Sequence, residues 1–220
     1  MENARAAAII LSAVPIAAAF IAQPLVGANV AVHWNAFGQA DGYAPKGILV
    51  WLSLLPGAML LVFLALPWLD PKGENLRAMG ADYDRLALAI VGFLAYLNLL
   101  VIAFNARIVR DFSPFFLPAI AALFFYFGIL LPRCRQSWFV GIRTPWTLSS
   151  YSVWQKTHNV GGGLFKAAAA IIVLSGAFFP QQAFLFSLSF IVASVAVLYG
   201  YSYAVWKKAF NLKWGGKVTG

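Results

Sequence analysis

Long apolar runs separated by short polar segments dominate this chain. Six runs are long enough to span a bilayer, at residues 4–23, 47–69, 86–106, 112–132, 164–179 and 183–206. A helix needs about 20 apolar residues to cross the hydrocarbon core. The fifth run is the shortest, but Lys166 near its start can extend its ammonium group to the interface. The pattern predicts an all-α integral membrane protein, built as a six-helix transmembrane bundle.

Two of the runs carry features that bear on helix shape and processing. Pro15 and Pro56 each remove a backbone hydrogen bond, so we expect kinks in the first and second helices. The first run has Arg5 near its start, then an apolar stretch and small residues near Ala19 and Ala22, as a cleaved signal peptide does. Its apolar stretch is long for that purpose, and we expect a retained helix.

Charge predicts how the bundle is oriented. The chain is 62% hydrophobic and 10% charged, with a net charge of +9. Its basic residues lie between the apolar runs and form no patch, which argues against direct binding of nucleic acid. With the N-terminus inside, three of the 16 Lys and Arg residues face outside, and thirteen, including Lys213 and Lys217, face inside. The positive-inside rule therefore predicts a cytoplasmic N-terminus and a cytoplasmic C-terminus.

Residues 32–46 form a polar, aromatic loop on the predicted outer side. Its candidate site residues are His33, Trp34, Asn35, Asp41 and Tyr43, and its glycines permit tight turns. Two interpretations are open. The polar groups satisfy one another in a folded cap, or the loop forms a recognition surface for an extracellular ligand.

Residues 133–163 form the longest predicted inner segment. Thr147, Ser149 or Ser150 is suited to cap a short helix, on which Tyr151, Trp154 and His158 share one stripe. Asn159 and the following glycines are expected to stop that helix. The result would be an amphipathic segment at the cytoplasmic interface. Arg143 is suited to grip helix carbonyls, a lipid phosphate or a partner carboxylate.

The inner segment carries a long motif. It reads Trp-Phe-Val-Gly-Ile-Arg-Thr-Pro-Trp-Thr-Leu-Ser-Ser over residues 138–150, and Val-Trp, Lys-Thr-His and Gly-Gly follow at 153–154, 156–158 and 161–162. This motif closely resembles the SdpI family, named for the immunity protein of the sporulation-delaying-protein toxin. The outer His33-Trp34-Asn35 pattern looks like the membrane domain that often precedes it. The motif residues singled out are Arg143, Thr144, Pro145, Trp146, Ser149, Ser150, Trp154, Lys156 and His158.

The resemblance implies a two-part chain and a protective role. Residues 1–110 would form an N-terminal membrane region with the outer loop, and residues 111–220 an SdpI-like region. The implied protein is a bacterial or archaeal multi-pass protein of the plasma membrane. It would give resistance to a secreted membrane-active peptide, with a signalling role in some members. The implied partners are membrane lipids, an extracellular toxin peptide and a cytoplasmic regulator. We expect no cofactor and no enzymatic activity.

Two other classes of function are weighed beside this one. A small transporter of a peptide or lipid would fit an inverted three-plus-three repeat, in which residues 33–38 and 158–163 are equivalent loops. A membrane-embedded hydrolase would use His158 with Ser149 or Ser150 and an acid from residues 70–84. A zinc site lacks enough ligands. Asn98 and Asn105 are the main polar residues of the third span, where hydrogen bonds between helices are the expected role.

Overall fold

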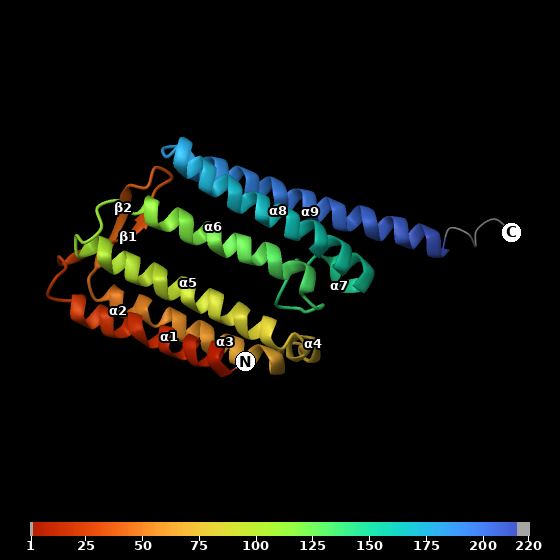
Figure 1. Ribbon diagram of the computed structural model, residues 1–220, viewed down its shortest axis with the longest axis horizontal. Coiled ribbons are helices and arrows are strands. Elements are labelled where there is room, and N and C mark those ends of the chain that lie inside the picture. The colour runs from red at the N-terminus through yellow and green to blue at the C-terminus, as the bar shows by residue number, and fades with distance from the viewer. Residues whose placement is uncertain (1, 215–220) are drawn as a thin grey trace.

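The computed structural model describes residues 2–214 and consists of long helices with a small β-hairpin at one end (Figure 1). The elements in chain order are α1 (Glu2–Ala22), β1 (Asn29–Trp34), β2 (Ala40–Pro45), α2 (Ile48–Ser53), α3 (Leu55–Leu69), α4 (Gly73–Ala78), α5 (Ala81–Asn105), α6 (Ser113–Leu130), a 3-10 turn (Leu131–Arg133), α7 (Pro145–Ser149), α8 (Tyr151–Phe178) and α9 (Ala183–Trp214). Lys217 lies outside the described residues, and so does the side chain of Lys213.

Within the described residues, six helical stretches are long and apolar enough to cross a membrane. They are Asn3–Ala22, Ile48–Leu69, Ala81–Asn105, Ser113–Arg133, Tyr151–Phe178 and Ala183–Asn211. The six predicted spans are therefore confirmed. Pro15 lies inside α1. At Pro56 the expected kink takes the form of a break, because α2 ends at Ser53 and α3 begins at Leu55, one residue before the proline.

The prediction of an all-α fold is wrong at the outer loop, which forms an antiparallel β-hairpin from β1 and β2. A tight turn joins the strands: the Asn35 amide donates to the Gln39 carbonyl, and the Gly38 amide donates to the Asn35 carbonyl, both at 2.9 Å. Gly38 has a φ of +76°, and a Cβ atom there would lie 2.2 Å from Ser113 Oγ. The positive φ favours glycine at this position, and the approach to Ser113 shows that the turn lies against the start of α6.

The expected stop at Asn159 is also wrong, because α8 continues through it as a single helix of 28 residues. The short interfacial helix and the fifth span are one element. The glycines serve packing here: a Cβ atom on Gly162 would lie 2.8 Å from both the Gly128 carbonyl oxygen and Pro132 Cγ. Small residues let membrane helices approach closely, and these glycines do so between α8 and α6.

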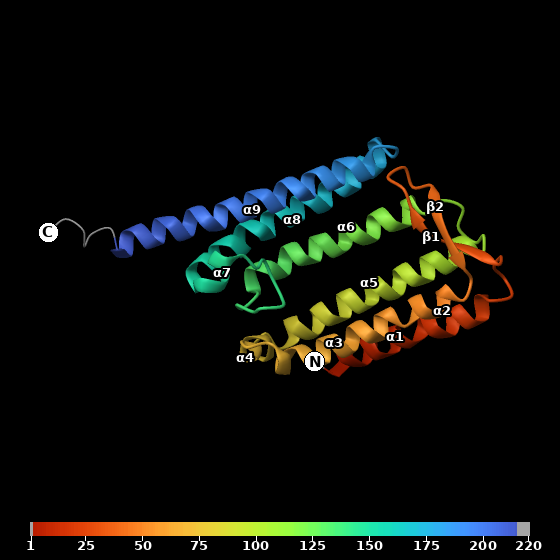
Figure 2. The same ribbon diagram turned by 180° about the vertical axis from the view of Figure 1, so that it is seen from behind.

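The helices form two halves. Figures 1 and 2 show α1, α3 and α5 together on one side and α6, α8 and α9 on the other, with α5 beside α6. The hairpin and the α8–α9 turn lie at one end of the bundle, while α4, α7 and the start of α1 lie at the opposite end. Each end has its own buried apolar cluster, one around Leu76 and Trp154 and the other around Leu49 and Phe112.

Candidate functional site

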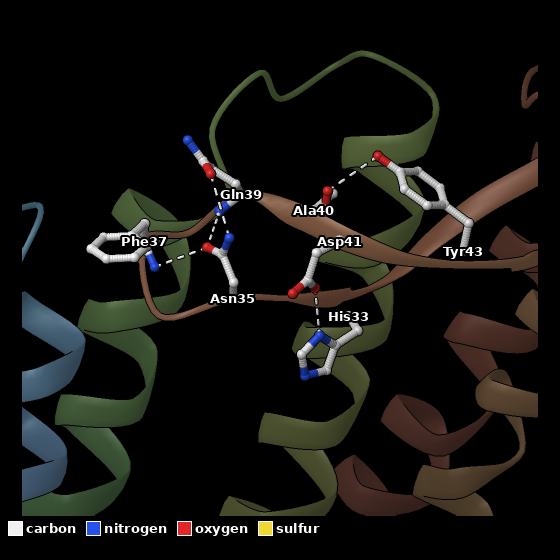
Figure 3. Close-up of polar contacts among 7 residues, drawn as sticks. All are labelled: His33, Asn35, Phe37, Gln39, Ala40, Asp41 and Tyr43. Atoms are coloured by element: carbon white, nitrogen blue, oxygen red, sulfur yellow. Dashed lines mark hydrogen bonds and ion pairs between the residues drawn. The ribbon is translucent and has the colours of Figure 1, made fainter.

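Asn35 shapes the turn of the hairpin (Figure 3). Its Oδ1 accepts hydrogen bonds from the backbone amides of Phe37 at 2.9 Å and Gln39 at 3.1 Å. Its Nδ2 donates to Gln39 Oε1 at 3.4 Å. An asparagine that bonds its own turn in this way fixes the backbone. For Asn35 the geometry therefore favours the folded-cap interpretation.

Four exposed side chains form what we name the hairpin surface: His33, Phe37, Asp41 and Tyr43. His33 Nδ1 lies 2.6 Å from Asp41 Oδ1, and the two side chains remain 71% and 44% exposed (Figure 3). The Tyr43 hydroxyl donates to the Ala40 carbonyl at 3.3 Å. Phe37 was not among the candidate site residues predicted from the sequence, although an exposed aromatic residue at a turn is a recognisable signal.

Trp34 belongs to the packing beneath the hairpin and is separate from this exposed surface. Its ring stacks on Phe112 with centroids 4.0 Å apart, and meets the edge of Phe104 at 5.2 Å. Trp34 therefore anchors the hairpin to the ends of α5 and α6.

Asn105 fastens the first strand to α5. Its Oδ1 accepts from the Ala31 amide at 2.7 Å, and its Nδ2 donates to the Ala31 carbonyl at 2.9 Å. Nδ2 also donates to the Val101 carbonyl at 2.9 Å. One side chain thus replaces a neighbouring strand for Ala31. The expected role of Asn105 in joining helices is corrected to joining a helix and a strand.

At the opposite end, the motif segment folds over a buried pair of rings on α8. Trp154 and His158 stack with centroids 3.9 Å apart, and Trp154 Nε1 donates to the Cys134 carbonyl at 2.8 Å. Gly141 crosses these rings with a φ of +111°, and a Cβ atom there would lie 2.5 Å from His158 Nε2. The predicted stripe of Trp154 and His158 therefore faces the protein interior, whereas Tyr151 is exposed.

Both ring nitrogens of His158 have backbone partners. Nε2 accepts from the Ile142 amide at 2.9 Å, and Nδ1 donates to the Trp154 carbonyl at 2.8 Å. This arrangement requires the neutral ring with its proton on Nδ1. It gives His158 a structural task, namely to hold the motif segment against α8.

The constellation considered for a hydrolase is not assembled. Ser149 Oγ donates to the Trp146 carbonyl at 3.1 Å, and Ser150 Oγ accepts from the Val153 amide at the start of α8. Within residues 2–214, no serine has a hydrogen bond to His158. The repeat considered for a transporter is also wrong in its parts, because His33 lies on a strand and His158 within a helix.

A buried carboxylate ties the motif segment to the N-terminal half. Asp70, which follows α3, accepts from the Ser137 hydroxyl at 2.5 Å and from the Trp138 amide at 2.9 Å. Next to it, Gln136 Nε2 donates to the Thr147 carbonyl at 2.6 Å, and Asn75 Nδ2 donates to the Gln136 carbonyl at 2.8 Å. We name these contacts the inner latch.

The rest of the motif docks α7 against α9. Thr144 caps α7 in a reciprocal arrangement with Thr147, and its hydroxyl donates to Ser202 Oγ on α9 at 3.0 Å. The Trp146 ring meets Tyr199 on α9, with centroids 4.9 Å apart. Sequence reasoning listed Thr147, Ser149 and Ser150 as possible caps, of which Ser150 caps α8. Pro145, Ser149 and Lys156 are exposed.

Arg143 is exposed at this end. One of its guanidinium nitrogens donates to the Trp138 carbonyl at 2.9 Å. At least two acceptors are expected of an anchor, and within the described residues Arg143 has this single one.

Cys134 is buried beside the Trp154 ring. Burial, with a smaller contribution from Asp82, raises the pKa of its thiol to about 12. Because the thiolate is the reactive form, this cysteine is chemically inert at neutral pH. Within the described residues, no group of three His, Cys, Asp or Glu side chains is placed to hold a metal ion.

Together these features define a multi-pass α-helical membrane protein with a folded hairpin at one end and a latched motif at the other. Residues 133–204 match the SdpI/YfhL protein family, and residues 10–60 match a domain of unknown function, DUF1648. The chain thus carries an SdpI/YfhL region that is preceded by a DUF1648 region. No curated protein and no solved structure matches the chain.

Proposed function

We propose that this chain is an immunity protein of the plasma membrane that gives resistance to a secreted, membrane-active peptide toxin. The observation that carries the proposal is the SdpI/YfhL family match over residues 133–204. In the proposed orientation both chain ends face the cytoplasm and the hairpin faces outside. The distribution of Lys and Arg supports this orientation through the positive-inside rule.

The hairpin surface is the proposed contact for the toxin. A peptide arriving from outside would meet it before any cytoplasmic group. Phe37 and Tyr43 offer apolar contact area, and the exposed pair of His33 and Asp41 offers orienting hydrogen bonds. Exposed aromatic residues beside polar ones are typical of recognition surfaces.

The end of the bundle that carries the SdpI motif would face the cytoplasm in this orientation. The inner latch holds the two halves together there, while exposed Arg143 and Lys156 present positive charge. A cytoplasmic regulator with acidic groups, or an anionic lipid, fits that surface.

Toxin challenge of cells with and without the protein tests the proposal, with survival and protein abundance measured together. Asp41→Asn and Tyr43→Ala should lower protection at normal abundance, because both side chains are exposed. Trp34→Ala should lower abundance, because its ring packs on Phe112. Tyr151→Ala, an exposed change at the opposite end, is the control and should protect fully. Full protection at normal abundance in both hairpin variants would exclude the hairpin as the contact, and no effect of deleting the protein would exclude immunity itself.

The orientation has its own test. Reporter fusions after Lys217 and within residues 38–42 should report opposite sides of the membrane. Reporters on the same side would contradict it.

A second candidate function is transport of a peptide or lipid. It is favoured by a cavity of about 330 Å³ that lies between the two halves beneath the hairpin. Transport predicts that labelled peptide accumulates on one side of proteoliposomes, whereas immunity by capture predicts binding without accumulation.

A further inference from the structure

Both family regions contribute to the cavity beneath the hairpin, together with residues that lie between the two regions in the chain. Its lining comes from the hairpin, the α2–α3 break, α5, the start of α6 and the start of α9. Leu52 and Leu55 belong to the DUF1648 region, and Ala183 and Phe184 to the SdpI region. Neither region encloses the cavity alone, so a site here would require both.

Two polar atoms of the lining residues are buried without a hydrogen-bond partner among the described residues. One is Oδ1 of Asn98, a residue on α5 that is only 6% exposed, and the other is Nε1 of Trp34. Buried polar atoms are nearly always paired in proteins, and each exception calls for an explanation. Here the two exceptions are an acceptor and a donor of two residues that line one cavity, and each atom is itself covered by neighbouring protein atoms.

The unpaired atoms specify the chemistry of an occupant. The indole N–H is a donor only, and the amide oxygen is an acceptor. A hydrocarbon chain would satisfy neither, and an ester supplies an acceptor only. An amide group supplies both a carbonyl oxygen and an N–H. The remaining lining is mostly apolar, and His33, its one ionisable residue, is paired with Asp41.

Size limits the occupant further. A volume of about 330 Å³ lies at the lower end of small-molecule pockets, which span roughly 300–1,000 Å³. A helix with its side chains is about 10–12 Å across and does not fit.

From these observations we propose that the cavity binds a short, uncharged, apolar peptide segment through one backbone amide. On binding, small rotations of the two side chains turn both atoms towards the occupant, so that Trp34 Nε1–H donates to the peptide carbonyl and Asn98 Oδ1 accepts from the peptide N–H. The inference deepens the proposed function and rests on it for the source of the peptide, since a membrane-active toxin offers such segments.

A second cavity supplies an internal control. It measures about 430 Å³, lies near the inner latch and is lined by apolar side chains such as Met59, Phe127 and Phe165, with the Cys134 thiol. None of its lining residues has an unpaired buried polar side-chain atom among the described residues. A hydrocarbon probe gains no hydrogen bond in either cavity, an ester probe gains one only from Trp34 beneath the hairpin, and an amide probe gains two there.

Binding of two matched probes to the purified full chain in detergent tests the inference. N-isobutyl-4-methylpentanamide carries one amide between two branched chains, and isobutyl 4-methylpentanoate has the same shape with an ester oxygen in place of N–H. The wild-type chain should bind the amide about two- to tenfold more tightly, as expected for one hydrogen bond to a buried group. Asn98→Leu should abolish this preference. Trp34→Phe should weaken binding of both probes, and Met59→Leu should change nothing.

Asn98→Leu is close in shape to the native residue, Trp34→Phe keeps an aromatic ring for packing on Phe112, and thermal unfolding of each variant checks that the fold is retained. Equal binding of amide and ester by the wild-type chain would overturn the inference. So would an unchanged preference in Asn98→Leu, or displacement of the amide by dihexanoyl phosphatidylcholine as strong as by unlabelled amide, which would identify a lipid site. These outcomes leave the toxin challenge untouched, so failure of the inference and failure of the immunity proposal are separately visible.

Discussion

Two adjacent glycines of α8 should respond in opposite ways to the same substitution. In Gly162→Ala the new methyl group would lie 2.8 Å from the Gly128 carbonyl oxygen and from Pro132 Cγ, whereas at Gly163 nothing lies within 4 Å. A backbone carbonyl cannot rotate away as a flexible side chain can, so α6 and α8 must separate. Both substitutions gain the same helix propensity, about 1 kcal/mol per Gly-to-Ala change.

Because the propensity gain is common to both variants, it cancels in their difference. The difference in the free energy of unfolding is then the overpacking cost, about 1–3 kcal/mol. In a protein of this size that corresponds to a melting-temperature gap of several degrees. We expect Gly163→Ala to melt at or above the wild type and Gly162→Ala below it, measured by thermal unfolding in one detergent. Equal shifts of the two variants would refute the close approach of α6 and α8.

Three further predictions concern the motif end. Asp70→Asn should destabilise the protein by about 3 kcal/mol, because the Ser137 and Trp138 donors lose a charged acceptor; an unchanged unfolding midpoint would contradict the latch. Cys134 should resist maleimide at pH 8 and react on denaturation, because its raised pKa keeps the thiol protonated. Rapid labelling of the folded protein would contradict this expectation. The raised pKa also stabilises the folded state below pH 9, and this stabilisation is lost as the pH rises towards 12. Arg143→Ala should change the unfolding free energy by no more than about 0.5 kcal/mol, as at other exposed positions, and a larger loss would restore its anchoring role.

The spans could be read from the sequence because hydropathy over about 20 residues follows directly from the thickness of the bilayer. The hairpin could not. Its strands are held by Asn105, which is 74 positions from Ala31 in the chain. The turn of the hairpin also lies against Ser113. Strand pairing outside the membrane depends on such distant contacts, and local pattern does not report them.

The glycines of α8 illustrate a second limit. In the sequence, Asn159 with three glycines at residues 161–163 is a signal for the end of a helix. In the structure α8 continues through these residues, and Gly162 serves close packing against Gly128 and Pro132 instead. For the candidate site, the residue types at the hairpin were predictable. The separation of Trp34, which packs inward, from His33 and Asp41, which face outward, was not, because it depends on where Phe112 lies.

The attachment of β1 to Asn105 also bears on the order in which the protein is made. Ribosomes deliver residues 29–45 to the membrane well before α5 exists, so Ala31 emerges without the side chain that receives it. The turn likewise lacks its support until Ser113 has been synthesised. The hairpin therefore reaches its final place only after the third span and the start of the fourth have been added, and a nascent chain halted before residue 105 displays strands with no helix to hold them.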